Sequence, residues 1–233
     1  MKNERQDQLK LSVIKLLYYN GPMSLAELSA CTHKSVPNVT GAINTLIKEG
    51  FVTEHGLAPS TGGRRPVKYQ LNSKKKLYVV AIAMDQFVTR IVAYNFNNEM
   101  VSPEVSIVLP LKDNDGAVDQ LCQFIRSYIR QSGLMYKHIL GIGIGMPGFV
   151  DVEKGINASF LPTRIEGLSL RDELSNALKL PVQIENDSSV IAISELHFGA
   201  AQGLKDVMVV NMGWGIGLGM IVNGRLFRGH NGY

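Results

Sequence analysis

From Leu77 onward, short apolar segments alternate with amphipathic ones, and this alternation restricts the possible fold more than any other feature of the sequence. The apolar segments predict β-strands. Residues 118–131 carry Leu121, Ile125 and Ile129 on one side and predict a helix. Strands alternating with helices indicate an α/β domain over residues 77–233. The expected strands are 77–84, 89–96, 105–111, 138–150, 181–186, 206–213 and 217–224, and the further expected helices are 168–178 and 187–199, the latter capped by Asp187 or Ser188.

Residues 1–71 have a different pattern, with amphipathic helical segments and no strand before the last third. The first helix is expected over Arg5–Tyr19. The second is expected from Ser24 to about Cys31, because Ser24 and Glu27 have the spacing of a capping box. The expected apolar face of the first helix consists of Leu9, Val13, Leu16 and Leu17.

A third helix is expected from Ser35 to Gly50, with Pro37 tolerated in its first turn. Its predicted buried stripe is Val36, Val39, Ile43 and Leu46. The side chains left outside that stripe are small or form hydrogen bonds, which suits contact with base edges or phosphates. Two short helices and a longer one after a tight turn predict a helix-turn-helix, and the alternative is a structural three-helix bundle. The candidate DNA contacts are Ser35, Asn38, Thr40, Asn44 and Lys48.

The segments 51–54 and 67–71 alternate like the two strands of a hairpin, which predicts the wing of a winged helix. Glycines allow close approach to DNA, and arginines are attracted to a narrow minor groove. We therefore expect wing contacts from Gly62, Gly63, Arg64 and Arg65, although a solvated basic turn would have the same composition. Residues 72–76, NSKKK, are expected to be a linker.

The charge distribution supports different partners for the two parts. Residues 1–76 contain 12 Lys and Arg against 5 Asp and Glu, whereas residues 77–233 contain 12 against 15. The basic part is the one expected to meet a polyanion. The first residues are too polar for a signal peptide and no long apolar run exists, so we expect a cytoplasmic protein without a membrane partner. Cys31 and Cys122 stand alone and predict neither a disulfide nor a metal site.

Three places in the α/β part are candidates for chemistry. The strand 141–148 has small residues that allow close packing or close approach of a ligand, and Gly148 is its candidate contact. The triplet Glu185-Asn186-Asp187 stands where a strand ends and a helix begins, which suits either paired sugar hydroxyls or an N-cap. The glycine-rich segment 213–219 is able to present backbone N–H groups to a phosphate, although it lacks the lysine of a P-loop.

These segments, in this order behind a winged helix, resemble the ROK family of repressors, open reading frames and sugar kinases. The most similar motifs are GGRRP, GIGIGMPGFVD, IENDSSVIAISELHFGA and GWGIGLGMIVNGRLFRG, and they are similar to those of the sugar-responsive repressors for N-acetylglucosamine and xylose. The resemblance implies an actin-like, ribonuclease H-like sugar-kinase-type domain with the sugar in a cleft. It also implies that Asn186 and Asp187 hold sugar hydroxyls, with the Asp acting as general base in the kinases.

The sequence departs from the kinase pattern at both phosphate loops. Kinases of the family carry Asp-x-Gly-Gly-Thr after the first strand, where this chain has Ala83-Met84-Asp85-Gln86-Phe87. The second loop usually carries Gly-Thr-Gly, where this chain has Trp214 in place of the Thr. Bulky residues obstruct the close backbone approach that a phosphate requires, so we expect no kinase activity.

The family pattern also continues with a Gly-Glu-x-Gly-His motif and a Cys-rich zinc site, and neither is found here. Either the chain is a fragment, or a natural truncation has removed most of the second lobe. We expect a fragment that contains no cofactor site of its own. A structural zinc would belong to residues beyond 233. Consistent with truncation, the final pair of strands has no following helices to cover its far face.

These observations predict a repressor that binds operator DNA as a homodimer or higher oligomer and responds to a sugar or sugar phosphate. The first alternative is a sugar kinase with a fused DNA-binding domain. The second is a repressor that senses a partner protein.

Overall fold

The computed structural model describes residues 2–57, 65–162 and 166–229. The chain divides into two compact units. Unit 1 consists of Met1–Lys76 together with Asn95–Glu99, and unit 2 consists of Leu77–Tyr94 and Met100–Tyr233. The boundary between Lys76 and Leu77 coincides with the change of sequence pattern at that position.

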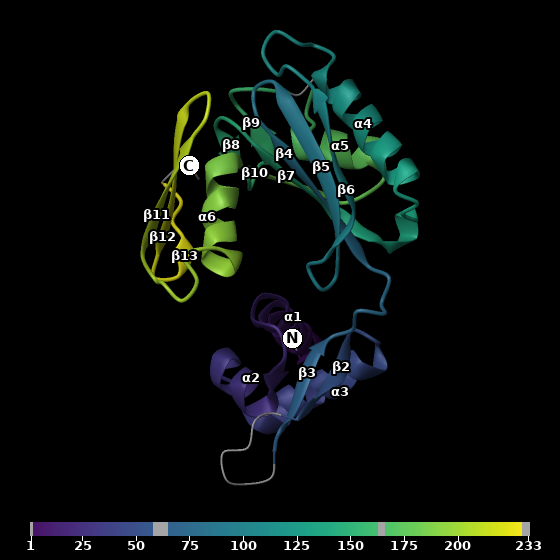
Figure 1. The fold of residues 1–233 in the computed structure, drawn as a ribbon, viewed down its shortest axis with the longest axis vertical. Coiled ribbons are helices and arrows are strands. Elements are labelled where there is room, and N and C mark those ends of the chain that lie inside the picture. The colour runs from purple at the N-terminus through teal and green to yellow at the C-terminus, as the bar shows by residue number, and fades with distance from the viewer. Residues whose placement is uncertain (1, 58–64, 163–165, 230–233) are drawn as a thin grey trace. The chain divides into compact units, whose positions relative to one another are not determined.

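Unit 1 is a three-helix domain with a small antiparallel sheet in the strand order β1-β3-β2 (Figure 1). All three predicted helices and both wing strands are present. Pro37 lies in the first turn of the third helix, where its missing N–H costs no hydrogen bond. The elements are α1 (Lys2–Asn20), β1 (Met23–Ser24), α2 (Leu25–Thr32), α3 (Val36–Lys48), β2 (Val52–Leu57) and β3 (Val67–Leu71).

The core of unit 1 forms where the apolar faces of its helices meet the sheet. Its buried residues are Val13, Leu17, Met23, Leu28, Val39, Ile43, Leu46, Val52 and Leu71. The predicted stripe of α3 is wrong at one position, because Val36 is 45% exposed. Val36 is the first residue of α3, before the helix reaches α1 and α2, and Ala42 is buried in the stripe instead.

The residues predicted to form a linker are attached to the end of α3. The Lys75 ammonium group donates a hydrogen bond of 2.6 Å to the Glu49 carbonyl and lies 3.6 Å from the centre of the Phe51 ring. The Asn72 amide donates to the Gly50 carbonyl at 3.0 Å. Carbonyls at a helix C-terminus lack partners within the helix, and Lys75 supplies one for the C-cap residue Glu49, while Asn72 binds the carbonyl of the residue after it.

Unit 2 is built around a five-stranded sheet in the order β10-β7-β4-β5-β6 (Figure 1). Strands β4, β7 and β10 run parallel, whereas β5 and β6 pair antiparallel. A second sheet contains β11, β12 and β13, and β8 pairs with β9. The strands are β4 (Tyr78–Met84), β5 (Val88–Asn95), β6 (Met100–Val108), β7 (Ile139–Met146), β8 (Val150–Asp151), β9 (Ile156–Asn157), β10 (Val182–Asn186), β11 (Val207–Met212), β12 (Ile216–Val222) and β13 (Arg225–Leu226).

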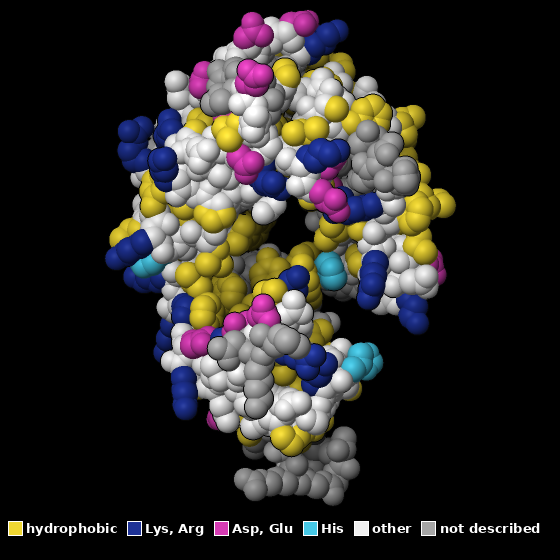
Figure 2. Space-filling model, turned by 180° about the vertical axis from the view of Figure 1, so that it is seen from behind, with side chains coloured by type: hydrophobic (Ala, Val, Ile, Leu, Met, Phe, Trp, Pro, Cys, Tyr) yellow, Lys and Arg dark blue, Asp and Glu magenta, His cyan; other side chains and the backbone are white. Residues whose placement is uncertain are grey.

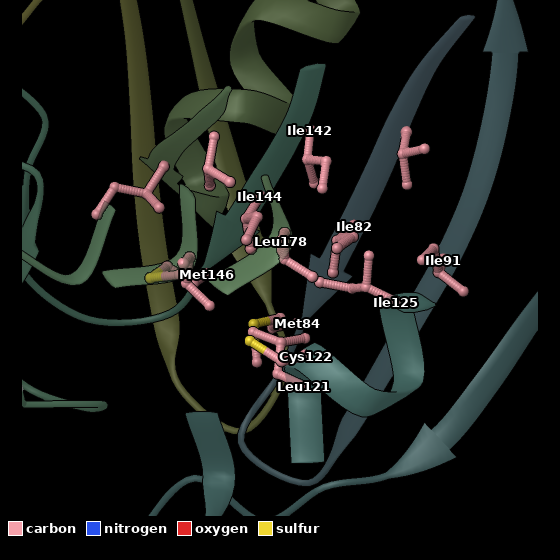
Figure 3. Close-up of a cluster of buried hydrophobic side chains, with 14 of the residues drawn as sticks. Ile82, Met84, Ile91, Leu121, Cys122, Ile125, Ile142, Ile144, Met146 and Leu178 are labelled. Carbon is pink, nitrogen blue, oxygen red and sulfur yellow. The ribbon is translucent and has the colours of Figure 1, made fainter. Parts of the chain in front are cut away.

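The main core of unit 2 lies between one face of this sheet and the helices α4 (Ala117–Gln131) and α5 (Leu170–Leu178). Figure 3 shows Ile82 and Ile144 from the sheet together with Leu121 and Ile125 from α4 and Leu178 from α5. Cys122 is buried in the same cluster, whereas Cys31 is exposed. A short 3-10 helix, Tyr136–His138, precedes β7.

Helix α6 (Asp187–Phe198) lies between the two sheets (Figure 1), and glycines make this close packing possible. A Cβ atom at Gly145 of β7 would lie 3.4 Å from Val190 of α6. At Gly219 of β12 it would lie 2.4 Å from the Ser188 carbonyl oxygen and 2.6 Å from Ala192. The glycine-rich segment 213–219 was a candidate for backbone contact with a phosphate. Residues 216–219 belong to strand β12, in agreement with the strand expected over 217–224, and Gly217 and Gly219 face α6.

The other face of the β11–β12 pair is exposed. Figure 2 shows hydrophobic side chains gathered on the side of unit 2 that this sheet forms. The side chains more than half exposed there are Met208, Val210, Met212, Ile216 and Leu218. Within the described ranges, no helix combines the length and the apolar character needed to cross a bilayer.

Candidate DNA-binding surface and ligand site

The exposed face of α3 carries the side chains that the sequence predicted as DNA contacts. Ser35, Asn38, Asn44 and Lys48 are exposed, and Thr40 is partly exposed. The Thr40 hydroxyl donates to the Val36 carbonyl at 2.9 Å, which keeps it against the helix and leaves its oxygen able to accept. Asn38, Thr40, Asn44 and Lys48 thus lie on the side of α3 away from the buried stripe, whereas Ser35 is the N-cap that precedes the helix.

The segment before α3 fixes how this surface is presented. Ser24 and Glu27 form the predicted capping box at the start of α2, with the Glu27 carboxylate 2.7 Å from the Ser24 backbone nitrogen. The hydrogen bonds from Ser24 lower the pKa of Glu27 below its ordinary value. At the other end of α2, His33 adopts a left-handed conformation with φ of 52°, and Ser29 donates to the Lys34 carbonyl at 2.6 Å. This tight turn leads directly into α3.

The wing strands β2 and β3 pair as predicted, with Val52 opposite Leu71 and Leu57 opposite Val67. Arg65 is exposed just before β3. The predicted contacts Gly62, Gly63 and Arg64 lie outside the described residues.

The predicted sugar-binding residues meet at one edge of the parallel strands of unit 2. Strands β4, β7 and β10 all end there, and they are followed by Asp85, Pro147-Gly148 and Asp187. Ligand sites of open α/β sheets lie at this carboxyl edge.

Asn186 connects two of these strand ends. Its side-chain amide donates to the Gly148 carbonyl at 3.0 Å, and its side-chain oxygen accepts from the Ser189 backbone N–H at 3.1 Å. The second bond makes Asn186 the N-cap of α6, so the predicted caps Asp187 and Ser188 are wrong by one and two positions. Both polar atoms of Asn186 keep further hydrogen-bonding capacity.

Asp187 follows as the first residue of α6 and is only partly buried. One carboxylate oxygen accepts from the Ser188 backbone N–H at 2.8 Å, and the other lies 3.4 Å from the side-chain amide of Asn211 in β11. Asn211 was not singled out in the sequence. The signal for it was a polar residue near the end of the otherwise apolar segment VMVVNM.

Glu185, the first member of the predicted triplet, is held by a residue from the far end of the chain. Arg228 donates to both of its carboxylate oxygens, one of them at 3.1 Å. These hydrogen bonds to Glu185 raise the pKa of the Arg228 guanidinium. A carboxylate bound in this way is oriented by the arginine, so Asp187 is the carboxylate more available to a ligand.

Gly148 has a structural requirement in addition to its predicted role. Its φ is +92°, and a Cβ atom there would lie 2.5 Å from the Cβ of Ser159. The Ser159 hydroxyl accepts from the Phe149 backbone N–H at 2.9 Å. Ser159 and Phe160 also line a cavity of about 520 Å³, together with residues 111–115, Val118, Leu161 and Pro162.

Two residues of the segments compared above with the kinase phosphate loops, Phe87 and Trp214, lie against each other. The Asp85 carboxylate accepts from the backbone N–H groups of Phe87 and Val88, both at 2.7 Å, and closes the turn after β4. The Phe87 ring meets the Trp214 ring edge to face, with centroids 4.7 Å apart. In the described parts of the chain, no three His, Cys, Asp or Glu side chains are placed to bind a metal ion.

Comparison with known proteins decides the family. Residues 88–233 match the ROK family, and this match covers more than half of the chain. The chain belongs to the ROK family. Residues 8–54 match the MarR family, in agreement with the helix-turn-helix of unit 1. The prediction of a helix-turn-helix domain followed by a ROK domain is confirmed.

Individual ROK proteins extend this result. The chain is 34% identical over 228 residues to the xylose repressor of Bacillus subtilis strain 168. The aligned region covers 95% of this chain and 57% of that protein. It therefore spans little more than half the length of this relative. The crystal structure of a ROK family transcriptional regulator, a homolog of the Escherichia coli MLC protein, matches 97% of this chain and 57% of that one, with 24% identity and a TM-score of 0.76. The ROK hexokinase of Thermus thermophilus matches 67% of this chain and 50% of that one, with 26% identity and a TM-score of 0.54.

Proposed function

We propose that this ROK protein is a sugar-responsive transcriptional repressor. Unit 1 binds operator DNA through α3 and the wing, and unit 2 binds a sugar or sugar phosphate at the carboxyl edge of β7 and β10. The observation that carries the DNA-binding part is the face of α3, which exposes Asn38, Asn44 and Lys48 opposite a fully apolar stripe. In helix-turn-helix proteins, the helix that follows the tight turn lies in the major groove and contacts base edges with its polar face.

Operator recognition by a homodimer fits this arrangement, because two copies of α3 enter successive major grooves of a pseudo-palindrome. The sugar acts by binding one conformation of the protein more tightly than another, which changes the fraction of molecules able to hold both half-sites. The xylose repressor among the relatives makes D-xylose the first sugar to test.

The DNA-binding proposal is tested by fluorescence anisotropy with a duplex selected by the wild-type chain from a randomised library. Lys48→Ala is expected to weaken binding and to lower the slope of log K against log salt by about 0.9, the effect of one lost phosphate contact. Lys137→Ala removes the same charge from an exposed position in unit 2 and serves as the control. An unchanged salt slope for Lys48→Ala would count against this helix as the DNA-contacting element.

The ligand proposal rests on the unused hydrogen-bonding capacity of Asn186 and Asp187, beside the Gly148 turn. Thermal shift with D-xylose, D-glucose, N-acetylglucosamine and their phosphates tests it, since a ligand that binds only the folded state raises Tm. If none raises Tm, the alternative of a repressor that senses a partner protein is favoured.

A kinase with a fused DNA-binding domain is the alternative that the structural match to a ROK hexokinase favours. Asp187 stands where the family resemblance puts the general base. The Phe87–Trp214 contact argues against it, because these rings replace the small residues of both phosphate loops. A coupled assay decides: sugar-dependent ATP turnover by the wild-type chain, abolished by Asp187→Asn, would replace the repressor proposal with the kinase.

A further inference from the structure

Helix α3 contains a glycine, Gly41, that the fold of unit 1 does not require. Gly41 lies in the interior of the helix and is exposed. A Cβ atom placed there would meet no atom within 4 Å, and the backbone has no positive φ at this position. Glycine in a helix interior destabilises the helix relative to alanine. Neither packing nor backbone geometry accounts for the residue, so its advantage lies outside the folded unit.

Gly41 occupies the middle of the exposed face of α3. At about 100° per residue, it lies on the arc formed by Pro37, Asn38, Asn44, Thr45 and Lys48, on the side away from the buried residues Val39 and Leu46. The candidate contacts Asn38, Asn44 and Lys48 therefore surround a position with no side chain.

The side chain of the neighbouring Thr45 does not project from the helix surface around Gly41. The Thr45 hydroxyl donates to the carbonyl of Gly41 itself at 2.9 Å and is thus held against the helix. The helix backbone is consequently accessible at Gly41, while longer polar side chains stand on both sides. A surface of this form lets a rigid ligand approach the helix axis more closely than an ordinary helix face does.

We propose that Gly41 is the point of closest approach between α3 and the DNA, and that its missing side chain sets how deeply α3 enters the major groove. The inference rests on the proposed DNA-binding function and adds a positioning residue to it. Asn38, Asn44 and Lys48 reach base edges and phosphates only at this depth, so a side chain at residue 41 weakens contacts that it does not itself make.

The test uses the full chain and two substitutions that add bulk and favour the helix, Gly41→Ala and Gly41→Leu. Both are expected to raise the Tm of unit 1, the alanine by about 4–8 °C. Both are expected to weaken binding to the duplex selected by the wild-type chain. The leucine variant should lose about tenfold or more in affinity, the scale of one lost base contact, and the alanine variant less. Gln8→Leu places the same leucine side chain at an exposed position of α1 and serves as the control for an added exposed leucine.

Variants that melt higher than the wild type and bind the duplex more weakly, in the order of side-chain size, support the proposal. Variants that melt higher and bind with wild-type affinity overturn it while leaving the DNA-binding function intact. A lower Tm for Gly41→Ala also overturns it, because the glycine would then serve the fold. A wild-type chain that selects no duplex defeats the DNA-binding function first, and the inference with it.

Discussion

Replacing Asn186 separates the two roles that its position in the sequence left open, helix cap and ligand contact. Asn186→Ala removes the N-cap bond to Ser189 and the amide bond to the Gly148 carbonyl. Loss of an N-cap costs about 1 kcal/mol, and loss of the second hydrogen bond costs roughly another 1 kcal/mol. For a unit of the size of unit 2, a total of about 2 kcal/mol corresponds to a fall in Tm of roughly 4–8 °C.

Two further variants assign these contributions separately. Asn186→Ser keeps an N-cap oxygen and loses only the bond to Gly148, so we expect about half of the fall in Tm. Ser169→Ala removes the N-cap of α5, whose hydroxyl accepts from the Asp172 backbone N–H, and leaves the strand edge unchanged. The Tm of Ser169→Ala should fall by about as much as that of Asn186→Ser. Calorimetry of the four proteins, with and without the sugar that stabilises the wild type, provides both readouts.

The ligand readout distinguishes the roles. If Asn186 contacts the sugar, both variants at residue 186 lose the sugar-induced rise in Tm, whereas Ser169→Ala keeps it. If Asn186→Ala melts within one degree of the wild type, or if the serine and alanine variants are equally destabilised, the hydrogen bonds assigned to Asn186 do not contribute as argued.

Two predictions concern other parts of the chain. Gly219→Ala should lower the stability of unit 2 by about 1–3 kcal/mol, because the new methyl group would lie 2.6 Å from Ala192, whereas Gly213→Ala, with no atom within 4 Å of the new methyl group, should melt near the wild type. Thermal denaturation of the two variants measures the difference, and equal melting would refute the packing role of Gly219. Glu27 has a lowered pKa in the folded state, so its contribution to stability is present above its ordinary value of 4.5 and is lost as the pH falls through the folded pKa. The Tm of unit 1 should therefore decrease on acidification below about pH 4.5, and Glu27→Gln should show a smaller decrease; identical pH profiles would show that the hydrogen bonds from Ser24 do not stabilise the carboxylate.

Local patterns in the sequence predicted most of the elements. The capping box at Ser24 and the alternation after Leu77 depend only on neighbours in the chain, and both were confirmed. Val36 was wrongly predicted to be buried because helical spacing shows which face of a helix is apolar, but not which of its turns pack against other elements. Glycine-rich sequence allows either backbone contact with a phosphate or close packing of a helix, and only the position of α6 against Gly219 distinguishes the two.

The sequence predicted the residues of the candidate ligand site that lie at the strand ends, but not the distant residues that contact them. Asn186 and Asp187 were found because a polar pair between a strand and a helix has few explanations. Arg228 lies 43 residues from its partner Glu185, and Asn211 lies 24 residues from Asp187. No local pattern connects residues so far apart, since their contact depends on how β11 and the segment after β13 pack beside α6.

The hydrogen bonds of Lys75 and Asn72 to the two residues that follow α3 change what the short segment between the two units can do. A slack tether would absorb a displacement of Lys76 by straightening. Here the same displacement acts on the carbonyls of Glu49 and Gly50, directly after α3, the helix proposed to contact DNA. A displacement of the junction is thus passed both to β3, which Asn72 follows directly, and to the residues at the C-terminus of α3.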